Sequence, residues 1–400
     1  MSFPKTGESN SLTIMDKSDN LHETEPKIYD TNLLHDGFRA VRKVSAWKDG
    51  TIKFEMNLCS ELTKLSNELK DGTYRVSPSN RFTINERGKT RYIHSGAIRD
   101  KVVQHVLCDV FVNPAVEKYL YSGNSASRKD KGVSHARERF ERHLHNYWLK
   151  HRTNDGYLAL LDFSKFYDNI QHDKVIDSFK EIVSADVLEV IRAVLKSFEV
   201  DVSYMTDAEY SNCMRERFDS VRYHQENHHK SKRRFMRKSV NIGDQLSQSI
   251  GIFFPTPIDN YVACVRGHRS YGRYMDDLWI IHKDKEYLCQ TVKGIEEQAE
   301  KLGLFINKKK THIVRLDRWF TFLQRQYKLE SKGRVAKKIR REAIARERRR
   351  LKKYRGLILR GCITKEEVAN CFKSWYYSVA DVLSKRQKQN IKQLYKEITL

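Results

Sequence analysis

The chain has 400 residues, of which 39% are hydrophobic and 11% aromatic, a composition suited to a globular protein of two or three packed units. Its 75 Lys and Arg against 51 Asp and Glu give a net charge of +24, which favours nucleic acid over a membrane as the polyanionic partner. No apolar run reaches the roughly 18 residues of a transmembrane helix. The N-terminus lacks the apolar core of a secretory signal, and the seven cysteines form no CxxC pair, which indicates reduced thiols and a cytoplasmic location.

The N-terminal third is predicted to start with a mobile tail, residues 1–27, that is rich in polar residues. Leucines at helical spacing within residues 33–69 then predict helices. Arg81–Ile84 and Arg91–Ile93 read as two strands around a Glu-Arg-Gly turn. Arg99–Val112 is amphipathic and predicts a further helix.

A basic loop and a charged helix follow. Residues 121–135 contain two glycines and a charged run, which predict a flexible basic loop, although an ordinary solvated loop would look the same. Ala136–Lys150 predicts a helix that is rich in charge on one side.

Two acidic strand ends lie far apart in the sequence. One strand, Tyr157–Phe163, ends near Asp162. The adjacent Asp276 and Asp277 form a predicted hairpin tip between the strands Ser270–Met275 and Leu278–His282. Because adjacent anions repel each other, the pair indicates a bound cation, although Asp-Asp alone is also typical of a solvated turn. Strands that bring these carboxylates together would make a two-metal site for phosphoryl transfer.

At this point the chain resembles the reverse transcriptases, and among them the bacterial enzymes. The segments similar to motifs A, B, C, D and E are, in order, Asp162–Ile170, Asn241–Gln248, Tyr274–Asp277, Leu302–Thr311 and Trp319–Leu323. The resemblance covers roughly residues 75–325. It implies an α+β right-hand polymerase with fingers, an antiparallel-sheet palm and a helical thumb.

The resemblance also implies a metal site. Asp162, Asp276 and Asp277 are expected to hold two Mg²⁺ ions, for which Mn²⁺ is a substitute, with the backbone carbonyl of Leu161 as a further ligand. Lys310 matches the family lysine that protonates the leaving pyrophosphate, which agrees with the attraction between an ammonium and a phosphate.

Five residues are implied to bind the incoming nucleotide. Lys89 and Arg91 match basic positions that grip the triphosphate, although they are also what exposed strand charges would look like. Tyr167 matches the steric gate that excludes a ribose 2′-OH. Gly243 lets the backbone approach the substrate, and Gln248 lies at the start of the next helix.

Motif B departs from the family pattern at two positions. Many members carry Gln before the glycine and Pro after the serine, where this chain has Ile242 and Gln248. The departure is similar to the motif of diversity-generating retroelement enzymes and of several defence-associated groups. It removes a polar contact near the nucleotide, which argues against high copying fidelity.

Three segments are expected to contact template and primer. Arg128 and Lys131 are implied to lie along the template, whereas Phe322 and Leu323 match the primer grip or simply a core strand. Residues 332–360 hold 14 Lys or Arg against 2 Glu. Such a run is usually a solvated face, but after a primer grip it resembles the thumb helix that tracks a duplex. The duplex-contacting residues expected there are Arg341, Arg348, Lys352 and Arg355.

The predicted domains are the tail (1–27), N-terminal helices and fingers (28–155), a palm (156–325) with an insertion (200–238), and a helical basic thumb (326–400). Residues 230–238 in the insertion are a candidate for backbone contact with nucleic acid or a solvated loop.

The expected function is that of an RNA-directed DNA polymerase with an RNA template, a DNA primer or product, and deoxynucleotides as partners. Tyr167 argues against an RNA-directed RNA polymerase, and the intact acidic set argues against an idle RNA-binding scaffold. Antiphage defence with a dedicated noncoding RNA is the first expectation for its biology, and a mutagenic diversity-generating retroelement enzyme is the second. The sequence leaves open the template, the primer, and whether the chain forms a homo-oligomer or binds a partner protein.

Overall fold

A four-stranded antiparallel sheet lies at the centre of the computed structural model, which describes residues 25–86, 89–225 and 232–399. Its strand order is β6-β7-β3-β8. The four strands are β3 (Tyr157–Asp162), β6 (Tyr271–Tyr274), β7 (Asp277–His282) and β8 (His312–Arg315). The predicted strand and hairpin around the acidic residues are therefore present, and we call this assembly the central sheet.

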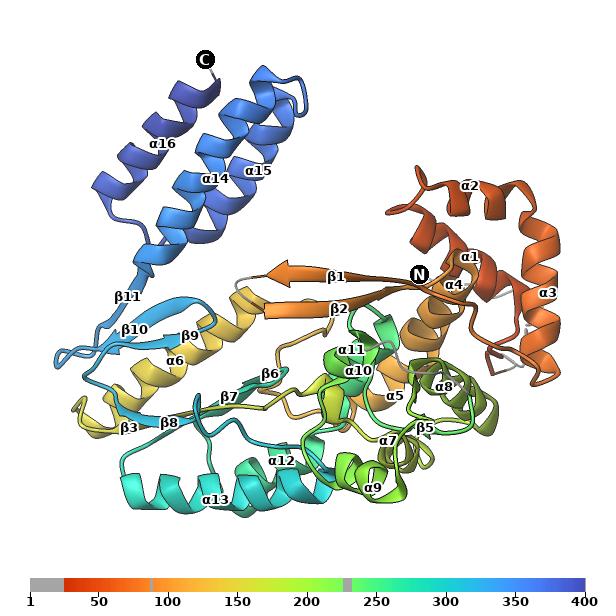
Figure 1. The fold of residues 1–400 in the computed structure, drawn as a ribbon. Helices are drawn as coiled ribbons and strands as arrows, with labels where there is room; N and C mark the ends of the chain where they lie inside the picture. The colour runs from red at the N-terminus through yellow and green to blue at the C-terminus, as the bar shows by residue number, and fades with distance from the viewer. Residues whose placement is uncertain (1–24, 87–88, 226–231, 400) are drawn as a thin grey trace, which may run out of the picture.

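Helices cover both faces of the central sheet, which explains why its middle strands are apolar at successive positions. One face packs against α13 (Lys285–Leu302) through Leu288 and Ile295. The other packs against α6 (Val133–His151), where Phe140 lies 5.0 Å from the Trp279 ring in an edge-on contact. Figure 1 shows α13 and α6 on opposite sides of the strands.

A helical region precedes the central sheet. Its helices are α1 (Thr31–Arg42), α2 (Asp49–Met56), α3 (Leu58–Lys70), α4 (Ile98–Val106) and α5 (Asn113–Glu117). The predicted Arg99–Val112 helix is present, but its final part, Leu107–Val112, is a π-helical segment, η1. The region shares one apolar core with α7 (His172–Phe179), α8 (Ala185–Phe198) and α11 (Gln245–Phe253).

The predicted N-terminal hairpin is longer than expected. β1 (Asn80–Glu86) pairs with β2 (Lys89–Ser95) along seven positions. In Figure 1 it extends from the helical region over the central sheet. An isolated bridge from Ile93 to Ile242 joins its base to the loop before α11.

Residues 200–238 form a small unit with its own core. It contains β4 (Val200–Asp201), α9 (Asp207–Arg215), α10 (Ser220–Gln225) and β5 (Phe235–Met236). The buried side chains that form its core are Val200, Val202, Met205, Phe218 and Met236. The part of the basic 230–238 run that precedes Lys232 lies outside the described residues.

The prediction that the chain is helical from residue 326 is wrong for its first part. β10 (Arg325–Leu329) pairs with both β9 (Phe320–Phe322) and β11 (Val335–Ile339) in a separate three-stranded sheet. Tyr327 and Leu329 are buried at alternate positions, as a strand requires. The many lysines and arginines of this segment concealed that alternation in the sequence.

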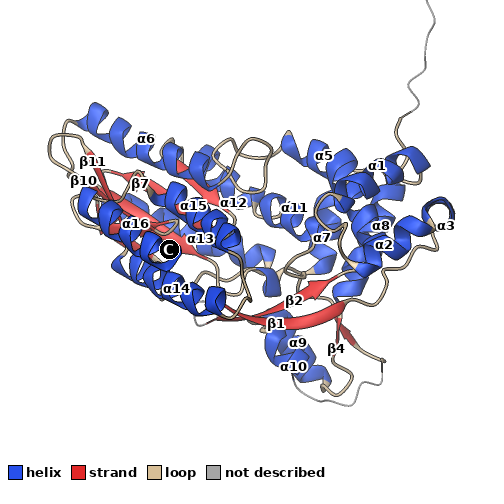
Figure 2. Ribbon diagram, turned by 90° about the horizontal axis from the view of Figure 1, so that it is seen from above, coloured by secondary structure: helices blue, strands red, loops and turns tan. Residues whose placement is uncertain are grey.

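The chain ends in a three-helix bundle, α14 (Arg341–Leu359), α15 (Lys365–Val379) and α16 (Lys385–Thr399). Its small core includes Leu351, Phe372 and Ile391. The bundle and the helices α1–α3 lie at opposite ends of the molecule (Figures 1 and 2). Among the described helices, none combines the length and the apolar character needed to cross a membrane.

Candidate active site

Strand register brings carboxylates together where the two middle strands of the central sheet, β3 and β7, meet at one end of the sheet. We call this end of the sheet the acidic edge. Asp162 on β3 lies directly opposite Asp277 on β7, and Asp276 precedes Asp277 in the chain. Like charges at directly opposite positions destabilise an antiparallel pair, so this edge requires a positive partner. The Lys310 ammonium supplies one, because it forms an ion pair with Asp162.

The surroundings of Lys310 keep its side chain protonated. Burial alone would lower its pKa, but the ion pair with Asp162 and the charges of Asp276 and Asp277 raise it above the usual value. Asn307 also donates from its amide side chain to Asp162, at 3.2 Å. The predicted acidic residues and Lys310 are thus neighbours, and the loop after α13 delivers two side chains to them.

The hairpin tip differs slightly from the prediction. Tyr274 pairs with Asp277, so the two-residue turn consists of Met275 and Asp276, and Asp277 already belongs to the strand. Met275 has φ of 54°, a left-handed conformation that costs energy for a residue with a side chain. The turn therefore needs support from the residues around it.

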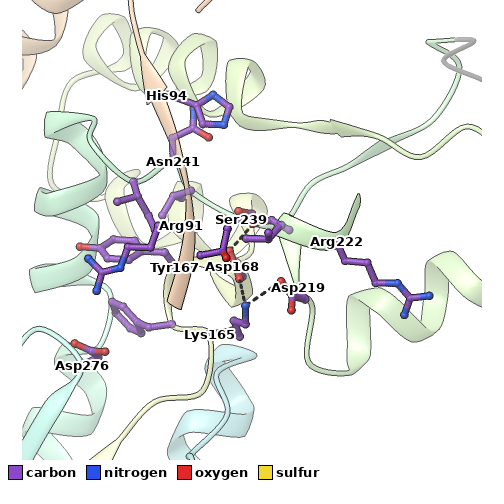
Figure 3. Close-up of a pocket in the computed structure, with 16 residues that line it drawn as sticks. Arg91, His94, Lys165, Tyr167, Asp168, Asp219, Arg222, Ser239, Asn241 and Asp276 are labelled. Carbon is purple, nitrogen blue, oxygen red and sulfur yellow. Dashed lines mark hydrogen bonds and ion pairs between the residues drawn. The ribbon is translucent and has the colours of Figure 1, made fainter. Parts of the chain in front are cut away.

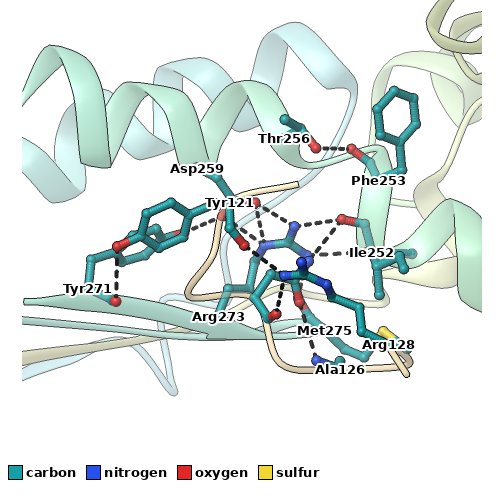
Figure 4. Close-up of polar contacts among 12 residues, drawn as sticks. Tyr121, Ala126, Arg128, Ile252, Phe253, Thr256, Asp259, Tyr271, Arg273 and Met275 are labelled. Atoms are coloured by element: carbon teal, nitrogen blue, oxygen red, sulfur yellow. Dashed lines mark hydrogen bonds and ion pairs between the residues drawn. The ribbon is translucent and has the colours of Figure 1, made fainter. Parts of the chain in front are cut away.

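That support comes from a buried ion pair that sequence reasoning missed. Arg273 and Asp259 are both fully buried and lie 2.6 Å apart. Arg273 also donates to the carbonyls of Met275, at 3.2 Å, and Ile252, at 2.7 Å. Figure 4 shows its guanidinium between the end of α11, the hairpin turn and Asp259 on α12 (Thr256–Asn260). Arg273 precedes the acidic pair by only three residues, but nothing local identified Asp259 as its partner.

The carboxylates of Asp162, Asp276 and Asp277 have the chemistry of ligands for a divalent metal ion, but their arrangement in this structure is not that of a metal site. Carboxylate oxygens are the ligands that Mg²⁺ prefers. Within the part of the chain that the structure describes, however, no three His, Cys, Asp or Glu side chains are grouped so as to hold a metal ion. Lys310 pairs with Asp162 instead. Leu161 pairs with Leu278 and lines the cavity beside Asp162.

A cavity of about 800 Å³ adjoins the hairpin turn. Arg91, Tyr167 and Asp276 line it together (Figure 3). Arg91 reaches it because β2 is joined to the loop before α11 through the Ile93–Ile242 bridge. Lys89 is the first residue of β2, but its side chain lies outside the described residues.

Tyr167 occupies a tight position on the floor of this cavity. Its hydroxyl lies 3.8 Å from the Met275 sulfur, and a β-carbon added at Gly251 would lie 3.0 Å from the same hydroxyl. Burial and, second, the charge of Asp276 raise the pKa of Tyr167 to about 12. The ring is therefore a neutral, closely packed obstacle next to the carboxylates.

The two motif B residues lie apart. Gly243 has φ of +114°, and a β-carbon there would lie 3.3 Å from the His94 carbonyl oxygen, so glycine permits the close approach of β2. Gln248 instead accepts a hydrogen bond from the Ser127 hydroxyl, at 3.2 Å. Ile242 lines the 800 Å³ cavity, whereas Gly243 and Gln248 are not among its lining residues.

A second cavity, of about 760 Å³, lies on the other side of the carboxylates. Asp162, Asp277 and Lys310 line it together with Phe322 and Leu323. Phe322 is buried in the core beneath α6, so the primer-grip and core-strand interpretations are compatible. The Leu323 carbonyl accepts a hydrogen bond from Arg137, at 2.6 Å.

The predicted template residues in the 121–135 loop have different surroundings. Arg128 forms an ion pair with Glu117 and donates to the carbonyls of Tyr121 and Asn124, with only 7% of its side chain exposed. This favours a role in shaping the loop over contact with a template. Burial, followed by the charge of Arg128, lowers the pKa of Lys131.

The four predicted duplex-contacting residues on α14 share one face. Arg341, Arg348, Lys352 and Arg355 are all exposed, and their spacings of seven, four and three residues place them within about 60° around a helix of 3.6 residues per turn. Leu351, Tyr354 and Ile358 pack into the bundle from a different face. The cations therefore form a stripe, which we call the α14 stripe.

The insertion supplies a wall of the 800 Å³ cavity that the sequence did not predict. Lys165, which has φ of 50°, lies 2.9 Å from Asp219. Asp168 accepts a hydrogen bond from the Ser220 hydroxyl, at 2.6 Å, and burial raises its pKa. These contacts attach the start of α10 to the turn after β3 (Figure 3). Asp168 is thereby a structural residue.

Comparison with known proteins gives one family. Residues 84–351 match the family model described as reverse transcriptase (RNA-dependent DNA polymerase). The matched segment spans more than half of the 400 residues and includes the acidic edge, both cavities and the first half of α14. No curated protein matches the chain.

Proposed function

The chain belongs to the reverse transcriptase family and is an RNA-directed DNA polymerase, a nucleotidyltransferase, and from this premise we propose that it extends a primer 3′-OH by two-metal-ion catalysis at Asp162, Asp276 and Asp277. The observation that carries the proposal is the register of β3 and β7, which sets two carboxylates opposite each other. Two Mg²⁺ ions bound there would stabilise the negative charge on the attacking and leaving oxygens of an in-line displacement.

In this proposal, each residue around the carboxylates has a separate role in binding or catalysis. The cavity beside Asp276 receives the deoxynucleotide, with Arg91 on the triphosphate and Tyr167 under the sugar. The cavity beside Asp277 and Phe322 receives the primer end. Lys310 holds a proton at Nζ and gives it to the pyrophosphate as it leaves. Before substrate arrives, the same ammonium offsets the repulsion between the carboxylates.

In the proposed right-hand architecture, the β1–β2 hairpin belongs to the fingers, the central sheet is the palm, and the α14–α16 bundle is the thumb. The α14 stripe then follows the phosphates of the template–primer duplex. Because the stripe is exposed and Arg128 is not, we assign duplex affinity to α14 rather than to the 121–135 loop.

Primer extension on a defined RNA template tests the activity directly. The expected result is incorporation of deoxynucleotides in the presence of Mg²⁺ or Mn²⁺, and little incorporation of ribonucleotides. Preference for ribonucleotides would instead support the RNA polymerase alternative. Binding of RNA without any incorporation, under conditions where the folded state is verified, would support the scaffold alternative.

For the biological role we propose antiphage defence by a bacterial enzyme that copies a dedicated noncoding RNA. The motif B departure supports this group of enzymes and equally the mutagenic retroelement enzymes, because Ile242 offers no polar group to the nucleotide cavity that it lines. Sequencing the RNA that purifies with the protein, together with the error rate of its DNA product, separates the two. Copies of one defined noncoding RNA favour defence, and error-rich copies of a neighbouring variable repeat favour diversification.

A further inference from the structure

A third cavity, of about 640 Å³, lies at the end of the central sheet opposite the carboxylates. It is enclosed by the end of α6, the loop before β6, the end of β7 and the start of α13. Asp277 and His282 are the two ends of β7, so five steps of about 3.4 Å, or about 17 Å in all, separate the two sites. The cavity is therefore distinct from the nucleotide and primer cavities.

The charge of this cavity is of one sign. Its lining contains the four cations Lys150, Arg266, Arg269 and Lys283, and none of the described residues that line it is Asp or Glu. The neighbouring carboxylate of Asp284 is engaged elsewhere, because it accepts the amide hydrogens of Glu286 and Tyr287 at the start of α13. A pocket with this lining attracts an anion.

Arg266 offers an unsatisfied donor. Its guanidinium lies over the Tyr287 ring, 4.1 Å from the ring centre, and its Nε donates to the Thr291 hydroxyl at 3.2 Å. Its Nη2 atom is buried and has no hydrogen-bond partner. A buried guanidinium nitrogen without a partner is costly, and a phosphate oxygen is the acceptor that it best fits.

Flat rings accompany the cations. His268, His282 and Tyr287 lie with ring centres 4.8–5.5 Å from one another, and Tyr147 lies 4.6 Å from His151. Burial lowers the pKa of His268 to about 4, so its ring is neutral at physiological pH. Neutral aromatic rings beside cations are the combination that binds unpaired bases together with their phosphates.

We propose that this cavity is a second nucleic-acid site, which holds a single-stranded segment of RNA outside the template–primer site. The cations contact its phosphates, and the half-buried rings of His282 and Tyr287 contact its bases. The site would anchor an RNA whose other end serves as template. This inference goes beyond the polymerase activity, because a short template that does not reach the cavity needs none of these residues.

The test uses the full chain already saturated with a short template–primer duplex. Binding of a fluorescent oligouridylate RNA is then compared between wild type, a pocket variant (Lys150→Gln, Arg269→Gln, Lys283→Gln) and a control with the same loss of charge on α2 and α3 (Lys53→Gln, Lys64→Gln, Lys70→Gln). All six residues are exposed, so both variants should fold.

The pocket variant should bind the oligonucleotide at least tenfold more weakly, and its salt slope should be less steep by about 2, since three single-strand phosphate contacts are lost at about 0.7 each. The control should match wild type. Equal affinity of the two variants would overturn the proposal. Binding of uridine monophosphate with no binding of the RNA would also overturn it, in favour of a free-nucleotide site.

Two further measurements keep the result independent of the polymerase assignment. Primer extension on the short template should be unchanged in the pocket variant, and a parallel loss of extension would contradict a separate site. In wild type, ultraviolet cross-linking of 4-thiouridine RNA should map to His282 or Tyr287, the half-buried rings of the cavity. Cross-links confined to other segments would show that the RNA lies elsewhere.

Discussion

The acidic edge of the central sheet and the α14 stripe both depend on charge, but they are built in opposite ways. At the edge, Asp162 and Asp277 face each other through strand register, and a fully buried ion pair supports the turn between β6 and β7. On α14, four cations project from an exposed face. The first arrangement fixes positions, whereas the second supplies attraction that needs no fixed position. Substitutions should therefore affect geometry and chemistry at the edge, but only affinity on α14.

The largest effect is expected from Asp277→Asn or Asp276→Asn. Loss of a metal-binding carboxylate should remove several kcal/mol of transition-state stabilisation, which at 1.36 kcal/mol per factor of ten lowers single-nucleotide incorporation by about a thousandfold or more. The midpoint of thermal unfolding should change little for Asp277→Asn, because relief of the repulsion from Asp162 is opposed by loss of the attraction to Lys310. Asp317→Asn, in a surface ion pair, is the control. Near-normal incorporation by both edge variants would refute the assignment.

The second-largest effect is expected for the buried ion pair of Arg273 and Asp259, and it is an effect on stability. Arg273→Met leaves the Asp259 carboxylate buried without its partner, which typically costs about 3–5 kcal/mol. Chemical denaturation should show this as a lower midpoint. The double variant Arg273→Met, Asp259→Leu should recover part of the loss, because no charge then remains buried. A single variant as stable as wild type would mean that the ion pair contributes little to the turn.

A third prediction concerns shape rather than charge. Tyr167→Val should open space in the nucleotide cavity and raise ribonucleotide use relative to deoxynucleotide use, by about 10- to 100-fold, the range for steric discrimination in a pocket. The ratio of the two kcat/KM values measures this. Phe179→Leu, within the buried core, controls for general loosening and should not change the ratio. An unchanged ratio for Tyr167→Val would show that Tyr167 is not the steric gate.

The smallest effect per residue is expected on α14. Changing Arg341, Arg348, Lys352 and Arg355 to Gln should weaken template–primer binding for all sequences alike, with a salt slope less steep by at most about 3.6, at 0.9 per B-DNA phosphate. An RNA–DNA hybrid need not share that coefficient. Incorporation at saturating duplex should suffer less than binding, and the unfolding midpoint should hardly move.

The matched control for the stripe removes four exposed cations in or next to the N-terminal helices, Arg39, Lys43, Lys53 and Lys70. If this variant loses as much affinity as the stripe variant, the effect is one of net charge. If neither variant loses affinity, the duplex is held by other residues and the α14 stripe is only a solvated face.

The central sheet and the positions of the acidic residues could be predicted from the sequence because their signals are local. Apolar runs bounded by carboxylates predicted β3, β6 and β7, and strand register followed once the strands paired. The role of Asp259 could not be predicted, because it depends on a contact with Arg273, fourteen residues away in the sequence, and no spacing rule indicates that contact. Arg128 appeared to be a loop charge because burial is not visible in a basic run. β10 and β11 were missed because charge obscured a two-residue alternation.

The insertion has a consequence for how this enzyme could vary. Its five buried apolar residues pack mainly on one another, and polar contacts attach it to the segment after β3, among them those of Asp219 and Ser220 and the buried hydrogen bonds between Asn169 and the Phe218 backbone. A segment with its own core can accumulate changes at positions away from these contacts without disturbing the sheet that carries the carboxylates. Because one of its edges is also a wall of the nucleotide cavity, such changes offer a route to new substrate preferences.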